Sequence, residues 1–269
     1  MATEARRDVV VLEARAERAE GGWRPAVRAA SLAGVVVAWE LATRLGGIPA
    51  VFLPPPTAVA AELLGMATGG ELWRSLQASL VRIVLGFLLG TGAGVVVGTV
   101  AAVSPLAEAV VDPLIAATYP IPKIALLPLL VLWLGIGEAS KVAVIAIGAF
   151  FPVAVGTMAG IRGTDPQLVR AAVSLGASPF QVVTKVRLPA ALPVMFAGFR
   201  LAAGMSLLLV VSAEMIAAAT GIGFTILHAG DLMQTSKLLA AIVVLSALGV
   251  LSTWGLQALE RKVVRGRPH

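Results

Sequence analysis

Four charged residues stand inside otherwise apolar stretches of this sequence, and they are its first candidates for chemistry. Arg82, Lys123 and Arg200 are basic, and Glu214 is acidic. Charges at membrane depth are costly unless they are paired or hydrated, so they mark either solute pathways or buried ion pairs. The cations could attract an anionic solute, or carbonyls, Glu214 and Glu40 on other helices could satisfy them. The sequence leaves both interpretations open.

The polar residues include no recognisable catalytic set. The chain has no cysteine, and its two histidines are His228 and the last residue, His269. No stretch has the phosphate-binding pattern G-x-x-x-x-G-K-[ST], and GIGEASK at 135–141 lacks the necessary Gly-Lys pair. We therefore expect no enzyme activity, no metal site and no cofactor in this chain.

Composition indicates which solvent surrounds the elements that position these charges. The 269 residues are 58% hydrophobic and 13% charged, whereas soluble domains are about 45–50% apolar and about 25% charged. No soluble core could hide so much apolar surface, so the sequence predicts an all-α membrane protein. The net charge of +6 reflects basic residues outside the spans, which favours membrane topology over nucleic-acid binding.

Six spans are predicted, because a membrane helix needs about 20 mostly apolar residues. The first 28 residues mix six arginines with five acidic residues and are no signal peptide, so we expect a cytoplasmic tail. The spans would form one permease domain over 29–258, followed by a second cytoplasmic tail over 259–269. The six predicted spans are 29–45, 76–103, 106–136, 141–161, 190–219 and 238–258.

Charge placement supports this count. With the N-terminus inside, an even number of spans puts three segments in the cytoplasm: 1–28, 162–189 and 259–269. They hold 14 of the 21 Lys and Arg residues, as the preference for basic cytoplasmic loops requires. A seven-span count would place 162–189 outside, so six spans fit better.

The third span is predicted to be broken. Pro120 and Pro122 interrupt it, and Lys123 lies near its middle. Each half has about 14 residues, or about 21 Å of helix, which is too short to cross about 30 Å of hydrocarbon. Freed carbonyls at membrane depth are tolerated only when they are buried in protein or line a wet cavity. The break is therefore a candidate for the translocation path, and a kinked packing helix is the alternative.

Glycine recurs every four residues in the second span, at Gly86, Gly90, Gly94 and Gly98. This spacing places all four on one helix face, where another backbone can approach closely. The pattern predicts tight helix packing.

The segment 162–189 is too polar to span the membrane, and its signals predict a pair of short helices. Asp165 precedes Pro166 and can cap the first helix, while Gly176 can end it. Ser178 can then cap a second helix, which Leu188-Pro189 should end at the membrane. Each helix carries an apolar stripe. Such helices could lie on the lipid surface or insert into a groove of a partner protein, and physics alone does not choose.

A family resemblance favours insertion into a partner protein. Arg170-Ala171-Ala172, then Gly176, and finally Val186 and Leu188-Pro189 resemble the EAA loop of binding-protein-dependent ABC importer permeases. Four further stretches are similar to the nitrate, sulfonate, taurine and bicarbonate branch of that family. One departure is that Arg170 stands where the family pattern has glutamate, so any ion pair of that glutamate cannot form. The four stretches are LPPPTAV (53–59), SLVRIVLGF (79–87), YPIPKIALLPLLVLWLGIGEASK (119–141) and AEMIAAATGIG (213–223).

The resemblance implies the type I ABC importer permease architecture in the cytoplasmic membrane of a prokaryote. Two permease subunits, most simply a homodimer, would enclose the path. Two ATP-binding subunits, which hold ATP and magnesium, would dock on the coupling loop 162–189. An external substrate-binding protein or lipoprotein would deliver solute to the outer loops 46–75 and 220–237. The residues expected to contact the ATPase are Arg170, Ala171, Ala172, Leu175, Gly176, Ala177, Ser178, Phe180, Leu188 and Pro189.

The cargo is left open at this point. A small organic or inorganic anion such as a sulfonate, taurine, nitrate or bicarbonate is expected, with a heterocyclic vitamin precursor or an aromatic acid as the alternative. A gradient-driven secondary transporter is the alternative from another class, but the chain lacks the internal repeats that it would require. Besides the protein subunits, membrane lipid is an expected partner. We expect no binding of nucleic acid. Candidate path residues are Arg82, Pro120, Pro122, Lys123, Arg200 and Glu214.

Overall fold

The computed structural model describes residue 27 and residues 29–264, and the regular structure in that part of the chain is entirely helical. Most of the predicted tail 1–28 and residues 265–269 of the second tail lie outside the described residues. A helix covers 29–45. The elements that follow are α2 (Pro56–Thr68), α3 (Glu71–Val103), α4 (Pro105–Thr118), η1 (Lys123–Leu126), α5 (Leu127–Leu134), α6 (Glu138–Arg162), α7 (Pro166–Ser174), α8 (Pro179–Val182), η2 (Val183–Arg187), α9 (Leu188–Ala217), α10 (Ile222–Asp231) and α11 (Thr235–Val264).

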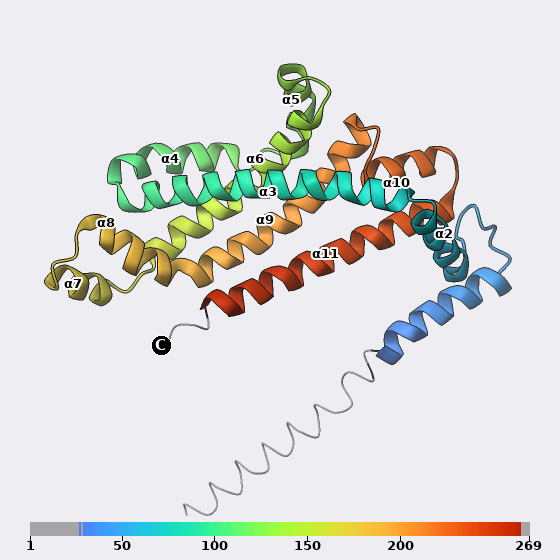
Figure 1. The fold of residues 1–269 in the computed structure, drawn as a ribbon, viewed down its shortest axis with the longest axis horizontal. Coiled ribbons are helices and arrows are strands. Elements are labelled where there is room, and N and C mark those ends of the chain that lie inside the picture. Colours follow the sequence, from blue (N-terminus) through green and yellow to red (C-terminus); the bar gives the residue numbers. More distant parts are fainter. Residues whose placement is uncertain (1–26, 28, 265–269) are drawn as a thin grey trace, which may run out of the picture.

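Four long helices, α3, α6, α9 and α11, run along the long axis of the molecule (Figure 1). The pair α7 and α8 lies at one end of this bundle, and α2 and α10 lie at the other (Figure 1). Of the most apolar stretch of each helix, 56% is buried in α6 but only 11% in α11. The core is therefore built around α6, while α11 lies at the edge.

The glycine face of α3 packs against α6, as the four-residue spacing predicts. A methyl group added at Gly90 would lie 2.2 Å from the Ala146 carbonyl oxygen, and one at Gly98 would lie 2.6 Å from the Ala154 carbonyl oxygen. Contacts this close leave no room for a side chain, so the two backbones touch directly. The packing interpretation of these glycines is confirmed.

Four helical segments are long and apolar enough to cross a membrane within the described residues: α3, α6, the continuous stretch Pro179–Ala217, and α11. α4 and the η1–α5 segment form a fifth candidate, bent by 93°. The helix over 29–45 has 17 residues, at the lower limit for a span. The all-helical membrane fold is therefore confirmed, whereas the count of six spans stays a prediction.

The predicted break in the third span is present. α4 ends at Thr118, and the chain turns through Pro120 and Pro122 before η1 begins at Lys123. Proline donates no backbone hydrogen bond, and the residue before it is pushed out of the helical conformation. The two prolines thus end α4, and α5 projects from the bundle (Figure 1).

The expectation that Leu188-Pro189 ends the second short helix is wrong. α8 continues through the π-helix η2 into α9, so that Pro179–Ala217 is one helical stretch. A proline ring normally collides with the carbonyl four residues earlier, which here belongs to Lys185. The wider π turn just before Pro189 gives the ring room, and π turns occur mostly as single turns of this kind inside α-helices.

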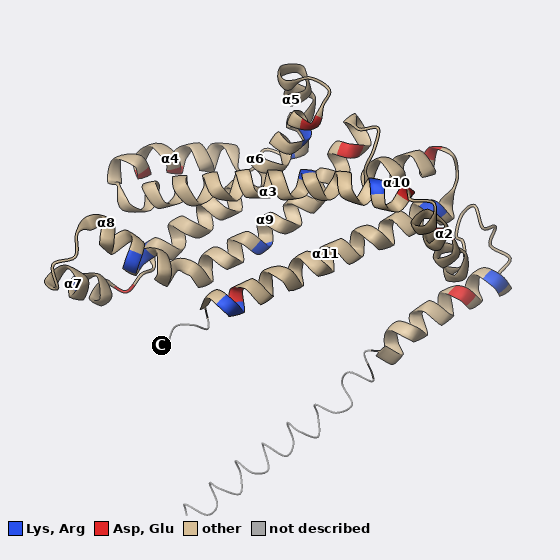
Figure 2. Cartoon of the chain, in the orientation of Figure 1, with Lys and Arg blue, Asp and Glu red and all other residues tan. Residues whose placement is uncertain are grey.

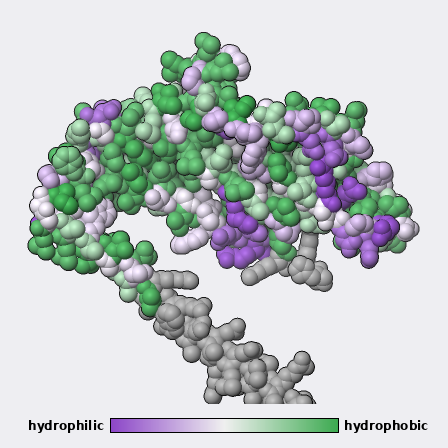
Figure 3. Space-filling view, turned by 180° about the vertical axis from the view of Figure 1, so that it is seen from behind, coloured by the Kyte–Doolittle hydropathy of each residue, from purple (hydrophilic) through white to green (hydrophobic). Residues whose placement is uncertain are grey.

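The surface matches a membrane environment along the bundle. Leu88, Leu89 and Val96 of α3 are exposed, and the apolar surface continues across much of the molecule (Figure 3). The charged residues lie mostly towards the ends of the long helices (Figure 2). Lipid or a second subunit must cover the apolar middle, since water would not.

Candidate functional site

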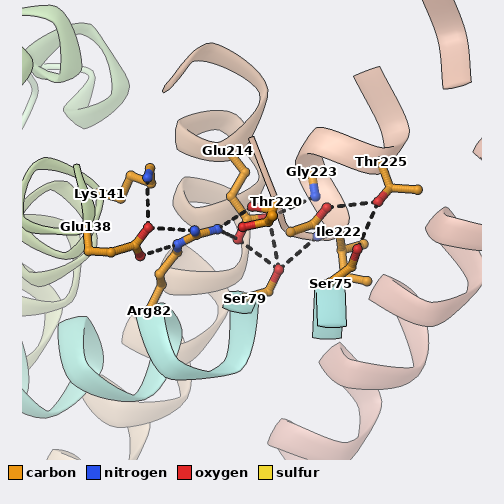
Figure 4. Close-up of polar contacts among 11 residues, drawn as sticks. Ser75, Ser79, Arg82, Glu138, Lys141, Glu214, Thr220, Ile222, Gly223 and Thr225 are labelled. Carbon is orange, nitrogen blue, oxygen red and sulfur yellow. Dashed lines mark hydrogen bonds and ion pairs between the residues drawn. The ribbon is translucent and has the colours of Figure 1, made fainter. Parts of the chain in front are cut away.

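The centre of the polar chemistry is an ion pair between α3 and α9. The Arg82 guanidinium donates to the Glu214 carboxylate over 2.7 Å (Figure 4). Both side chains are almost completely buried. Charges so deeply buried must be paired and hydrogen-bonded to be stable, and the sequence separation of 132 residues shows that the fold supplies the pairing.

A second carboxylate, from the start of α6, completes the arginine contacts. Glu138 receives two hydrogen bonds from Arg82, over 2.6 and 2.7 Å, and a third from Lys141 over 3.0 Å. Glu138 itself is 62% exposed. Its two parallel bonds fix the direction of the guanidinium, while the exposed position limits their contribution to stability.

The same carboxylate of Glu214 anchors the start of α10. It accepts hydrogen bonds from the backbone N–H of Gly223 (2.8 Å) and from the Ser79 hydroxyl (2.8 Å). The N–H of Ile222 in turn donates to the Ser79 oxygen (2.9 Å). Two orphan donors at the beginning of a helix are thus satisfied by α3 and α9. The network ties α10 to the bundle (Figure 4).

Gly221 allows this close approach. Its φ is +128°, and a methyl group there would lie 2.3 Å from the Glu214 carboxyl carbon. Only glycine adopts this backbone conformation readily, and only glycine leaves room for the carboxylate.

These contacts favour the structural alternative for Arg82. The guanidinium makes four hydrogen bonds, the fourth to the carbonyl oxygen of Thr220 over 2.7 Å. Glu214 is a partner, as one alternative supposed. Glu40 is not, because it contacts Arg44 and Thr57 instead.

Arg200 is placed away from this network. It forms an ion pair with Glu260 of α11, 60 residues further along the chain. Nothing in the sequence pattern links the two residues, since the pair depends on where α11 crosses α9. The contact ties the peripheral helix to the core.

Lys123 lies at the break between α4 and η1, where it is buried. Its ammonium group donates to the carbonyls of Thr118, Tyr119 and Ile121, over 2.7–3.0 Å. It also lies 4.2 Å from the centre of the Phe151 ring, a favourable cation–π distance. The three donors of the lysine thus satisfy carbonyls that the broken helix leaves free.

A cavity of about 210 Å³ adjoins this break. Pro122, Lys123 and Phe151 line it on one side, and Leu201 and Met205 of α9 line it on the other. Its wall is mostly apolar with one cationic group, an arrangement that suits a small ligand. Pro120 lies in the turn outside its lining.

The predicted helix caps of the segment 162–189 are confirmed. The Asp165 carboxylate accepts from the backbone of Gln167 over 2.7 Å, with Pro166 in the first turn of α7. Gly176 follows the end of α7 with a φ of +82°. Ser178 and Gln181 form a reciprocal capping box at the start of α8.

The short helices present apolar side chains to the outside. Leu175 is 89% exposed and Phe180 is 76% exposed, with Leu168 at 53%. Two exposed hydrophobic side chains of this size near one turn indicate a contact surface. Of the other predicted coupling residues, Ala171 and Ser178 are exposed, and Ala172, Ala177, Leu188 and Pro189 are half-buried.

Sequence reasoning missed three members of the network, Ser79, Glu138 and Lys141. Glu138 and Lys141 are charges three residues apart at the beginning of an apolar run, a signal for paired groups on one helix face. In the described part of the chain, no three His, Cys, Asp or Glu side chains are grouped as a metal site would require.

Together these features define a class: a helical membrane transport subunit with a broken span and an exposed helix pair at one end of the bundle. The chain belongs to the family described as binding-protein-dependent transport system inner membrane component, which matches residues 90–265. It is thus a multi-pass inner-membrane permease of the ABC importer type, which excludes the gradient-driven alternative.

Two relatives cover most of both chains. The putative aliphatic sulfonates transport permease protein SsuC of Bacillus subtilis (strain 168) is 38% identical over 247 residues, or 91% of this chain and 88% of the relative. The taurine transport system permease protein TauC of Escherichia coli (strain K12) is 39% identical over 238 residues, or 87% and 86%.

Solved structures of importers share the fold. A chain of the inward-facing MetNI methionine ABC transporter has a TM-score of 0.57 at 23% identity, covering 72% of this chain and 94% of the other. A chain of an amino acid ABC transporter crystallised with histidines has a TM-score of 0.56 at 20% identity, covering 76% and 98%. The expected importer-permease fold is confirmed.

Proposed function

We propose that this permease imports an organic sulfonate, with taurine and short aliphatic sulfonates as the substrate class. The observation that carries the proposal is the identity of 36–39% with three relatives whose names specify aliphatic sulfonates or taurine. Sulfonates are anions at neutral pH, and the cavity beside Lys123 has one cationic group in an apolar wall. This combination suits an anion with a short hydrocarbon part.

Within this function, the cavity formed by Pro122, Lys123 and Phe151 is our candidate for the translocation path. The hydrogen bonds of Lys123 go to neutral carbonyls, so its positive charge is not cancelled by an acid. Arg82 and Arg200, in contrast, face carboxylates. Among these three candidate path cations, Lys123 is thus the one best able to attract an anion.

The exposed surface formed by Leu175 and Phe180 is proposed to dock on a separate ATP-binding subunit, which holds ATP and magnesium. An amphipathic helix inserting its apolar face into a groove is a common recognition mode. The caps at Asp165 and Ser178 stabilise the starts of α7 and α8. Rigid-body motion can then pass through η2 into α9, because the helix is continuous.

This docking sets the orientation of the chain. The α7–α8 end is proposed to face the cytoplasm, with both termini on the same side, and α2 and α10 to face an external substrate-binding protein. Two copies of the permease and two ATP-binding subunits would complete the transporter. The exposed apolar middle of the bundle supports pairing of the permease with a second copy.

The docking proposal is tested by Phe180→Ser. We expect the variant to lose most of the ATP-binding subunit that copurifies with the tagged permease, because the apolar anchor is gone. Phe52→Ser is the matched control, since Phe52 is 77% exposed and lies in the loop before α2, at the opposite end of the bundle. Equal recovery of the ATP-binding subunit with the two variants would refute the assigned docking surface.

The substrate proposal is tested on the whole transporter, purified from its native cells through a tag on this chain. After reconstitution with its binding protein, we expect taurine or a short alkanesulfonate to stimulate ATP hydrolysis at least several-fold. Nitrate, bicarbonate and an aromatic acid serve as comparison solutes. Stimulation by one of these, without stimulation by any sulfonate, would overturn the substrate class and leave the docking proposal intact.

A further inference from the structure

A second cavity, of about 360 Å³, lies at the α7–α8 end of the bundle. Three arginines line it: Arg162 at the end of α6, Arg170 on α7, and Arg187 directly before α9. Its apolar wall includes Ala102 near the end of α3 and Ile161. Three cationic residues from three different elements of the segment 162–189 therefore meet at one hollow.

Two of the arginines have no side-chain partner within the part of the chain that the structure describes. Arg162 forms ion pairs with Glu108 (3.1 Å) and Asp112 (3.5 Å) of α4. For Arg170 and Arg187, neither a hydrogen bond nor an ion pair of the side chain is found among the described residues. The cavity thus keeps positive charge that the described residues do not neutralise, which favours an anion.

We propose that this cavity binds the phosphate of an anionic phospholipid. Its lining comes from the ends of α3 and α6, from α7, and from Arg187, the last residue of η2 directly before α9. The ends of membrane spans lie at the depth of the headgroups. Basic pockets between membrane helices are suited to anionic headgroups. Arginine donates paired hydrogen bonds to phosphate oxygens with good geometry.

The apolar half of the lining identifies a lipid as the source of the phosphate. Ala102, Ile161 and Val169 line the same hollow as the two unpaired guanidiniums. In a phospholipid, the phosphate of the headgroup matches the arginines, and the glycerol with the first acyl carbons matches the apolar side chains. Free phosphate offers the oxyanion without any hydrocarbon, and taurine or a short alkanesulfonate offers only a few carbons to cover these three residues.

The anchoring of α7 gives the site a role. None of the residues of α7 is buried, so its own packing holds it only weakly against the bundle. A lipid phosphate between Arg170 and Arg187 would bridge α7 to the start of α9. The lipid would fix the docking helices relative to the spans, and Arg170 would serve this bridge where the family pattern has glutamate.

The test uses the tagged transporter with its copurifying subunits, extracted in detergent from membranes that contain phosphatidylglycerol. Bound lipid is counted by mass spectrometry for the wild type and for Arg170→Gln/Arg187→Gln. The control is Arg261→Gln/Lys262→Gln, which removes two exposed basic residues at the end of α11. We expect retained phosphatidylglycerol to fall at least three-fold in the first variant only. Arg170→Lys/Arg187→Lys should restore part of it.

Equal retention in the two neutralised variants would overturn the proposal. If Arg170→Gln/Arg187→Gln fails to assemble, the thermal stability of the wild-type complex is measured in lipid nanodiscs instead. Its thermal midpoint should rise when phosphatidylglycerol replaces phosphatidylcholine, and excess inorganic phosphate or taurine should not reproduce the rise. The same midpoint in both lipids, or a rise with either free anion in phosphatidylcholine, would overturn the lipid as the occupant.

Discussion

At the α10 end of the bundle, Arg82 and Glu214 bury their charges in a network that satisfies nearly every donor. At the α7–α8 end, Leu175 and Phe180 are exposed, and Arg170 has no partner within the described chain. The first end is complete within one chain, whereas the second presents groups that a partner would cover. A fully satisfied hydrogen-bond network holds its helices in a fixed geometry. Exposed apolar side chains, in contrast, indicate a surface that binds another molecule.

This difference suggests a division of labour within the permease. The α10 end keeps its helices in fixed relative positions by hydrogen bonds, since α3, α6, α9 and α10 all contribute to one network. The α7–α8 end keeps its internal shape through helix caps and leaves its contacts open. Long, directly packed helices join the two ends. Three substitutions test this contrast, one at each end and one between them.

Arg82→Ala should have the largest effect. It leaves Glu214 as an unpaired charge in a fully buried position, and breaking a buried ion pair in this way costs about 3–5 kcal/mol. We expect a clear drop in the thermal unfolding midpoint of the purified permease. Arg74→Ala on the same helix is the control, because Arg74 is exposed and its loss should cost at most about 0.5 kcal/mol. Similar midpoints for both variants would show that the network is not stabilising.

Gly90→Ala tests the connection between the ends. The new methyl group would lie 2.2 Å from a backbone oxygen of α6, and overpacking of this kind costs about 1–3 kcal/mol. Gly92→Ala provides the matched control on the opposite face of α3, where nothing lies within 4 Å of the added carbon. The thermal midpoint should fall for the first variant only. A fall of the same size in both would mean that helix packing is not the cause.

Gly176→Val should change stability least and coupling most. Its φ of +82° strains a β-branched residue by about 1–2 kcal/mol, and that strain falls on an exposed turn. We expect near-normal unfolding but ATP hydrolysis that no longer drives uptake, measured as solute imported per ATP. Gly176→Asn is the control, because asparagine tolerates this conformation. Unchanged uptake per ATP in the valine variant would contradict the proposed role of the loop.

Local features were predictable from the sequence. Prolines at 120 and 122 located the break in the third span, and the four-residue glycine spacing located the packed face of α3. The caps at Asp165, Gly176 and Ser178 were equally readable. Each of these signals depends on the conformation of a few neighbouring residues, which the side chains themselves largely determine.

Pairings between distant helices were not predictable in the same way. The contacts of Arg82 with Glu138 and of Arg200 with Glu260 join residues 56 and 60 positions apart. Helical periodicity indicates which residues share a face, but it does not say which two faces meet. The π turn before Pro189 was missed for a related reason: proline usually ends a helix, and only the continuous packing of α9 shows that this helix adapts.

The π turn also makes the length of the segment Val183–Arg187, which joins α8 to α9, more important than its composition. Because Pro179–Ala217 is a single helical stretch, adding or removing one residue in Val183–Arg187 would rotate everything before it by about 100° around the axis of α9. The Phe180 side chain would then point in a different direction around the axis of α9, although the local hydrogen bonds of α8 stayed intact. The five residues of η2 thus set the direction in which α8 would present Phe180 to the proposed ATP-binding subunit.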